Sequence, residues 1–259
     1  MKRLLKDIRL LPVCITICSL VMVFVFSGVA VTSAKAEEEY LPPKMIYKVR
    51  EDLSKANSVS RKSGYFKLDA TPILQYPELP TGCEVTSLAT VLNFYGCDVD
   101  KIYLAEYYLE QGEIGNTNPF NAFVGSPFSK NAYGCYSDVI ENTALGYIND
   151  YGLDLNVKNL SKLDFPQLLK YVEDGHPVIF WATMNLAKPY ESTVWQIDGS
   201  SVVWYAYEHC MVLLGFDYDT DCYIVSDPLK GITEYKKELV EVRYNQIGKQ
   251  AVLVSEGRG

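Results

Sequence analysis

The chain has 259 residues, of which 48% are hydrophobic and 13% aromatic, and its formal net charge at pH 7 is −8. This composition predicts a globular chain with a sizeable core, long enough for one large domain or for a domain with an extension. The negative charge argues against nucleic acid as a partner, because phosphate backbones repel an acidic surface. Solubility alone accounts for the acidity, and these numbers leave the oligomeric state unknown.

The first 36 residues have the pattern of a secretory signal peptide. Basic residues precede an uncharged apolar stretch at 10–31, and an Ala-x-Ala site follows at 34–36. We therefore predict a signal peptide at 1–36 and a protein that is secreted or held at the extracellular face of the cell envelope. Loss of this segment removes five basic residues and one acidic residue, and the net charge becomes −12. The 22 apolar residues are also enough to span a bilayer, so an uncleaved anchor stays open as the only route to a membrane.

Residues 37–70 are rich in charge, serine and proline, and we predict a linker or extension there. The main domain is predicted at 71–255. Its first helix is expected at 83–95, where apolar residues recur at helical spacing until Gly96. Further helices are expected at 101–111, 136–151 and 163–174. Between them, the aromatic-rich segment 114–136 predicts a long functional loop rather than a disordered one.

After residue 176 the pattern changes to short apolar runs, which predict strands. These runs lie at 177–184, 202–206, 210–216, 223–225 and 251–254. An N-terminal helical half packed on a C-terminal antiparallel sheet is an α+β domain. We expect the active cleft between the two halves.

Cys83 follows Pro80-Thr81-Gly82, where a proline and a glycine break the chain just before the helical pattern begins. A thiol in the first turn of a helix lies near unpaired N–H groups and the positive end of the helix dipole. Both favour the thiolate, the form of cysteine that attacks carbonyl groups. We therefore predict Cys83 as a nucleophile, although a lone cysteine at a helix start is more often a packed small residue.

His209, one of two histidines, comes 126 residues after Cys83, and Asp227 comes 18 residues later, each beside an apolar run. The order nucleophile, base and orienting group is the papain-type arrangement. In these roles Cys83 attacks the carbonyl, His209 holds the thiolate as an ion pair and protonates the leaving amine, and Asp227 orients the ring. Taken singly, His209 also fits a structural histidine and Asp227 a turn residue.

Two groups are candidates for stabilising the oxyanion of the reaction. One is the backbone N–H of Cys83, and the other is the side-chain amide of Gln75, eight residues upstream. A surface glutamine before a proline bend is the alternative for Gln75. His176 is predicted to be structural or exposed. Glu84 and Glu208 adjoin the predicted nucleophile and base, and either tune the charge there or are ordinary residues.

Five cysteines remain beyond the signal segment, and four of them could pair in an oxidising compartment while Cys83 stays free. The sequence leaves open whether Cys97, Cys135, Cys210 and Cys222 form disulfides or stay buried thiols. We predict no metal site and no cofactor. The chain has two histidines, no CxxC pair and neither of the usual glycine-rich phosphate loops.

The segment 75–87, QYPELPTGCEVTS, resembles the nucleophile segment of the peptidase C39-like family. The resemblance continues at 122–128, 133–136, 175–179, 208–215, 226–231 and 248–252. Members of this family are papain-clan relatives of bacteriocin-leader peptidases, found as secreted or surface proteins in Gram-positive bacteria. The resemblance implies a papain-like α+β fold, with Cys83, His209 and Asp227 at the triad positions.

This chain departs from the papain-type pattern at two points. The pattern places its oxyanion glutamine about six residues before the cysteine, whereas Gln75 lies eight before it. The transporter-fused relatives carry membrane and nucleotide-binding domains, which are not seen here, so we do not expect double-glycine leader removal during export.

Three functions are compatible with these observations. The first is a secreted or surface-attached thiol peptidase that acts on a peptide or protein substrate. The second is an acyl or peptidyl transferase that uses the same thioester intermediate, and the third is a non-catalytic surface-binding domain of the same fold. The complete set of Cys83, His209 and Asp227 argues against the third.

Overall fold

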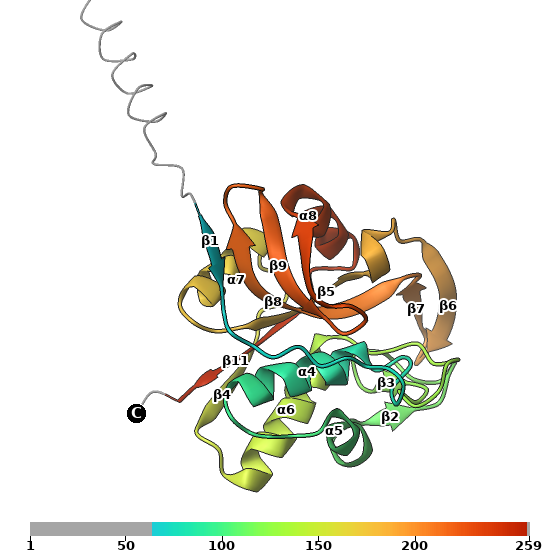
Figure 1. The fold of residues 1–259 in the computed structure, drawn as a ribbon. Helices are drawn as coiled ribbons and strands as arrows, with labels where there is room; N and C mark the ends of the chain where they lie inside the picture. Colours follow the sequence, from blue (N-terminus) through green and yellow to red (C-terminus); the bar gives the residue numbers. More distant parts are fainter. Residues whose placement is uncertain (1–63, 258–259) are drawn as a thin grey trace, which may run out of the picture. The chain divides into compact units, whose positions relative to one another are not determined.

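The centre of the molecule is an antiparallel sheet of seven strands (Figure 1). A computed structural model describes residues 64–257 of the chain. Along the sheet the order is β10 (Gly231–Lys236), β9 (Cys222–Asp227), β8 (Glu208–Asp217), β5 (Val178–Thr183), β11 (Ala251–Glu256) and β4 (Leu155–Asn159), and β1 (Tyr65–Lys67) pairs with β8.

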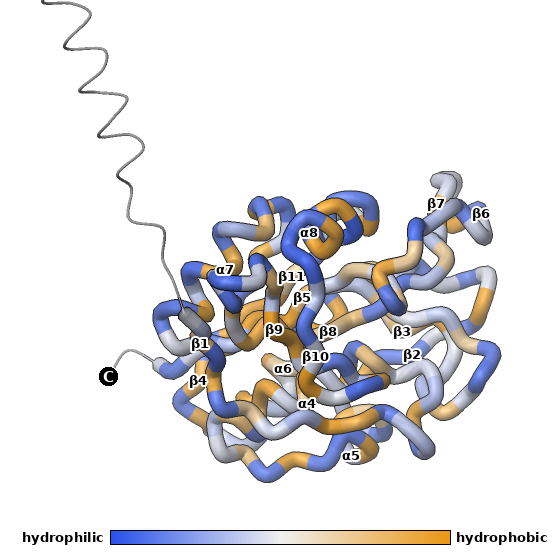
Figure 2. The backbone as a smooth tube through the Cα atoms, turned by 45° about the horizontal axis from the view of Figure 1, so that its top comes forward, coloured by the Kyte–Doolittle hydropathy of each residue, from blue (hydrophilic) through white to orange (hydrophobic). Residues whose placement is uncertain are grey.

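Helices cover both faces of this sheet (Figure 1). One face packs against α4 (Cys83–Phe94) and α6 (Ser137–Tyr151), with α5 (Lys101–Tyr107) packed on α4, and the other face packs against α7 (Phe165–Glu173) and α8 (Lys237–Gln246). Successive residues of β8 serve the two faces in turn, as the pleat of a strand requires. Figure 2 shows the hydrophobic residues gathered in the central strands and in α4. The α+β prediction is confirmed, with the C-terminal helices α7 and α8 as a second layer.

Helix α4 is the element that fixes the position of Cys83. Residues 83–92 are all buried, so this helix has no solvent face along most of its length. It packs against β8, where the Ser87 hydroxyl donates a hydrogen bond to the carbonyl of Cys210 at 3.3 Å. The first turn of α4 is thereby held beside the first residues of β8.

Strand β1 lies inside the predicted N-terminal extension, residues 37–70. Residues 65–67, assigned to that extension, form a strand on β8, in which Phe66 lies opposite Phe216. A Cβ atom at Gly215 would come within 2.0 Å of the Phe66 carbonyl oxygen, so the close approach of β1 needs a glycine there. The predictions for residues 1–63, including the signal peptide, lie outside the described residues.

Several elements were missed or misjudged. The missed ones are β4, β10, α8 and the strand β6 (Glu191–Ile197), which forms a hairpin with β7 (Ser200–Tyr205). Helix α5 ends at Tyr107 instead of residue 111, because Gln111–Gly112 (β2) pairs with Phe123–Val124 (β3). After a buried Gly231, strand β10 alternates between exposed and half-buried residues, which gave no continuous apolar run.

The five cysteines of the described chain are free thiols: Cys83, Cys97, Cys135, Cys210 and Cys222. This settles the question that the sequence left open in favour of unpaired cysteines. Within residues 64–257, no helix combines the length and hydrophobicity needed to cross a bilayer.

Candidate active site

The thiol of Cys83 lies at the start of α4 with its side chain 6% exposed. Its Sγ accepts a hydrogen bond from the backbone N–H of Cys210 at 3.4 Å and donates one to Oε2 of Glu84 at 3.2 Å. The preceding residue has to be glycine, because a Cβ at Gly82 would come within 2.8 Å of the Leu79 side chain. As the first residue of the helix, Cys83 also has a backbone N–H without a partner within the helix.

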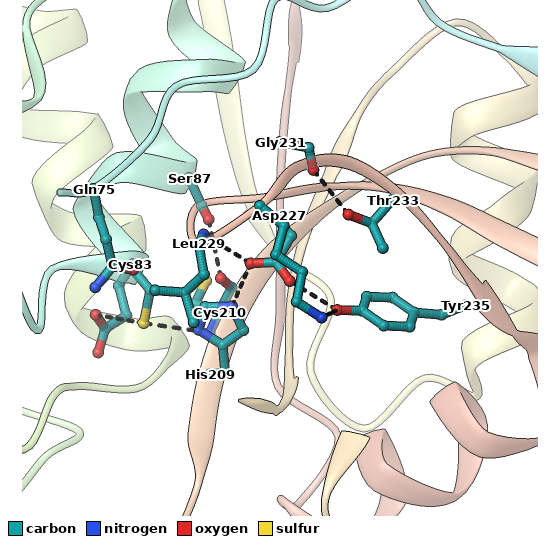
Figure 3. Close-up of polar contacts among 12 residues, drawn as sticks. Gln75, Cys83, Ser87, His209, Cys210, Asp227, Leu229, Gly231, Thr233 and Tyr235 are labelled. Carbon is teal, nitrogen blue, oxygen red and sulfur yellow. Dashed lines mark hydrogen bonds and ion pairs between the residues drawn. The ribbon is translucent and has the colours of Figure 1, made fainter. Parts of the chain in front are cut away.

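His209 is the second residue of β8 and is almost completely buried. Its Nε2 lies 2.8 Å from Oδ1 of Asp227. An ionised carboxylate only accepts hydrogen bonds, so Nε2 carries the proton and Nδ1 is left free to accept one. Figure 3 shows His209 beside Cys83, whose sulfur contacts the peptide N–H that follows the histidine.

Asp227 ends β9 and accepts three hydrogen bonds. Oδ1 accepts from His209 and from the backbone N–H of Leu229 at 2.8 Å, and Oδ2 accepts from the Tyr235 hydroxyl at 2.8 Å. Burial by itself would raise the pKa of Asp227, but the hydrogen bond and charge of His209, followed by the bonds from Leu229 and Tyr235, outweigh it and lower the pKa. Asp227 is therefore held ionised and oriented toward the imidazole.

Gln75 reaches the same site despite its eight-residue spacing. Its side chain is buried next to Cys83 (Figure 3), and its backbone N–H donates to the carbonyl of Pro228 at 2.9 Å. One amide N–H of the side chain donates to the Pro80 carbonyl at 2.9 Å. The amide has two N–H bonds, so the second stays available to an oxyanion.

The site also contains two buried carboxyl groups to which the sequence gave no definite role. Glu84 follows the nucleophile and Glu208 precedes the base, and both are buried. Glu84 accepts a hydrogen bond from the backbone N–H of Cys135 at 2.8 Å. A Cβ built on Gly134 would contact both carboxyl groups, so the two acids lie side by side under this glycine. Only the folded contact between α4 and β8 brings them together.

This acid pair corrects the predicted ionisation of Cys83. Burial, and then the charges of Glu84 and Glu208, raise the pKa of the Cys83 thiol well above its usual value. Burial also raises the pKa of both acids, that of Glu84 to about 7. The helix start was expected to favour a thiolate, but desolvation and two carboxyl groups outweigh the dipole, and the resting group is a neutral thiol.

The family profile of the peptidase C39-like proteins matches residues 67–252. The chain belongs to this family. A crystal structure of a putative C39-like peptidase from Bacillus anthracis is similar, with 30% identity and a TM-score of 0.68, over 75% of this chain and 99% of the other. Uncharacterized protein YvpB of Bacillus subtilis is 27% identical over 256 residues, covering 93% of this chain and 99% of YvpB.

Family membership and architecture together make this a papain-like fold, as the resemblance implied. In this C39-like domain the helix that carries Cys83 and the strand that carries His209 come from opposite halves of the sequence. The adjacency of Glu84 to Cys83, and of Glu208 to His209, was the one available signal for the acid pair. It had little weight, because 124 residues separate the two acids.

Proposed function

We propose that this C39-like protein is a cysteine peptidase that cleaves peptide bonds through Cys83, His209 and Asp227. The observation that carries the proposal is the hydrogen-bonded pair of His209 and Asp227 beside the thiol of Cys83 (Figure 3). Family membership supports a cysteine peptidase in general terms. The assignment of the three residues rests on their geometry and order.

The first step begins from a neutral thiol. In the resting protein the S–H of Cys83 points to Glu84, so the thiol has to turn toward Nδ1 of His209. As Sγ forms a bond to the substrate carbonyl carbon, Nδ1 accepts the thiol proton and becomes part of an imidazolium. Asp227 stabilises this cation through Nε2–H. The oxyanion receives hydrogen bonds from the Cys83 backbone N–H and from the free amide N–H of Gln75.

The second half of the reaction reverses these proton movements. The imidazolium of His209 gives its proton to the leaving amine as the C–N bond breaks, and a thioester on Cys83 remains. His209 then takes a proton from water as the oxygen attacks the thioester. The thiol recovers that proton when the acid product leaves.

We place this activity outside the cell or on the outer face of its envelope. The support is the basic, apolar and Ala-x-Ala pattern of residues 1–36, which lies outside the described part of the chain. Sequencing the N-terminus of protein recovered from the culture medium tests this. A start at Glu37 supports secretion, and intact chain in the membrane fraction supports an anchor.

The peptidase activity is tested with a proteome-derived peptide library, whose cleavage products are identified by mass spectrometry. We expect Cys83→Ala and His209→Ala to lower cleavage by at least about 10³-fold. Cys97→Ala is the matched control, because this half-buried thiol lies outside the site and its loss leaves cleavage unchanged. Cleavage that survives Cys83→Ala would overturn the assignment of the nucleophile.

The same experiment separates hydrolysis from transfer. With an added amine acceptor, a peptidase still gives free carboxylates, whereas a transferase gives amides from the common thioester. If no peptide is cleaved and an electrophilic probe labels Cys83 no faster in the original chain than in His209→Ala, the chain is a non-catalytic binding domain.

A further inference from the structure

Glu84 and Glu208 are two buried carboxyl groups that lie close together without a positively charged partner in residues 64–257. Glu84 is fully buried and Glu208 is 7% exposed. Among the residues that the structure describes, no lysine, arginine or histidine forms an ion pair with either acid. A buried carboxylate without a counter-charge is costly, so these acids need protons or a cation.

Glu208 adds a second, independent observation. Its Oε1 is buried and has no hydrogen-bond partner, a state that is rare in folded proteins and calls for an explanation. Glu208 lies two residues before Cys210 on β8, so the two side chains are on the same face of the strand, the face that packs on α4. The unpartnered carboxyl is therefore on the side of the sheet that holds the nucleophile.

The donor atoms already have the spacing of a small metal centre. Sγ of Cys83, one oxygen of Glu84 and one oxygen of Glu208 all lie within 4.8 Å of one another. Ligand atoms around a tetrahedral zinc ion lie roughly 3.4–3.7 Å apart, given the usual Zn–S and Zn–O distances. The Sγ to Glu84 distance of 3.2 Å is close to this range, so a small shift of the Glu208 carboxyl group, which has an unpartnered oxygen, completes the set.

We propose that Cys83, Glu84 and Glu208 form a zinc-binding site that reversibly blocks the nucleophile. Two carboxylates alone would suit a hard cation such as Ca²⁺ or Mg²⁺, but a thiolate ligand selects a softer one. Three protein ligands leave a fourth tetrahedral position for water. No closely spaced ligand motif in the sequence marks this site, because its three residues come from α4 and β8.

The rest of the site supports this ligand set. The hydrogen bond from the Cys135 N–H to Oε1 of Glu84 orients that carboxyl and leaves Oε2 facing Sγ, as outer partners of metal ligands do. Binding forms a Zn–S bond and breaks the S–H bond, and that proton and any on the carboxyls go to solvent, with no change of oxidation state. The sulfur is then directed to the acid pair and not to His209.

The test uses Cd²⁺ as a spectroscopic probe, because a cadmium–thiolate bond absorbs in the ultraviolet. The purified chain is titrated with Cd²⁺, and Zn²⁺ is then added as a competitor. We expect one Cd²⁺ per chain, a band that Cys83→Ala abolishes, and an affinity that falls at least about 10-fold in Glu208→Gln and in Glu84→Gln. Zn²⁺ should displace the probe and protect Cys83 from iodoacetamide.

Two controls make the result specific. Cys135→Ala removes a buried thiol that neighbours the same acids but is outside the ligand set, and should leave the affinity within about 3-fold. His209→Ala should do the same. Loss of binding in His209→Ala with no change in Glu208→Gln would place the metal on the Cys83–His209 pair and overturn the proposal, as would the absence of any band from Cys83. If Glu208→Gln does not fold, Glu84→Gln decides. These readings need no substrate, so they stand apart from failure of the peptidase proposal.

Discussion

The two sides of the site differ in how completely their polar groups are paired. Around the base, Asp227 accepts three hydrogen bonds and is ionised, and His209 is held by one of them. Around the nucleophile, the neighbours are Glu84 and Glu208, whose pKa values burial raises, and one of their oxygens has no partner. The His209–Asp227 side is therefore held in place by hydrogen bonds in the resting protein. The Cys83 side instead has two buried carboxyl groups that no nearby positive charge of the described residues balances.

This difference assigns the two sides different tasks. A satisfied hydrogen-bond network favours one geometry, which suits the orientation of a general base. The buried carboxyl groups keep Cys83 neutral. A proton, a metal ion or the imidazolium of His209 can each supply the positive charge that balances them. Under the mechanism that we propose, thiol activation depends on His209 during the reaction and not on the helix start alone.

The largest effect should come from removing the carboxylate that accepts the hydrogen bond of His209. Asp227→Ala removes the acceptor of three hydrogen bonds and leaves His209 without its orienting partner. We expect kcat/KM for peptide cleavage to fall by roughly 10³–10⁴-fold, the range known for loss of the orienting acid in other triads. Asp227→Asn is the matched variant, because its amide oxygen can still accept from Nε2–H although the negative charge is gone. A much smaller loss than in Asp227→Ala would show that orientation matters most, and an equal loss that the charge, with the imidazole tautomer that it favours, matters most.

The pH dependence of the free energy of unfolding should have opposite signs for Asp227 and Glu84. The pKa of Asp227 is lowered, so its contribution to the free energy of unfolding is present above the ordinary value of 3.8 and is lost as the pH falls further. The pKa of Glu84 is raised from 4.5 to about 7, so the folded chain binds its proton more tightly than the unfolded chain. Stability therefore falls as the pH rises from 4.5 to about 7, by on the order of 3 kcal/mol.

Glu84→Gln isolates this contribution. The variant should gain about 2 kcal/mol relative to the original chain between pH 5 and pH 7.5, measured by urea unfolding at both pH values. Glu106→Gln, on the exposed surface of α5, is the control and should show no such gain. A constant difference between Glu84→Gln and the original chain across this range would mean that Glu84 is not buried as described.

The sequence could predict features that depend on local patterns, but not those that depend on packing in the folded chain. Strands β5, β8, β9 and β11 are continuous apolar runs, so they were predicted, while β6, β10 and α8 have exposed faces and were missed. Cys83, His209 and Asp227 were proposed from residue type and order. The pairing of Glu84 with Glu208 was not, because it needs the packing of α4 on β8. The raised pKa of Cys83 has the same origin, since burial is a tertiary property that a helix-start motif does not contain.

The smallest effect should come from removing one hydrogen bond to Asp227 while the other two remain. Tyr235→Phe removes the hydroxyl that donates to Oδ2 of Asp227, while both bonds to Oδ1 remain. A hydrogen bond to a charged group contributes about 1.5–3 kcal/mol, and only part of it affects the orientation of His209, so we expect kcat/KM to fall by roughly 10-fold. Tyr223→Phe is the matched control, because its hydroxyl donates to Glu241 at the same distance of 2.8 Å, away from His209. Both variants should lose similar stability, but only Tyr235→Phe should lose activity. Equal activity in the two would mean that Oδ1 alone orients the base.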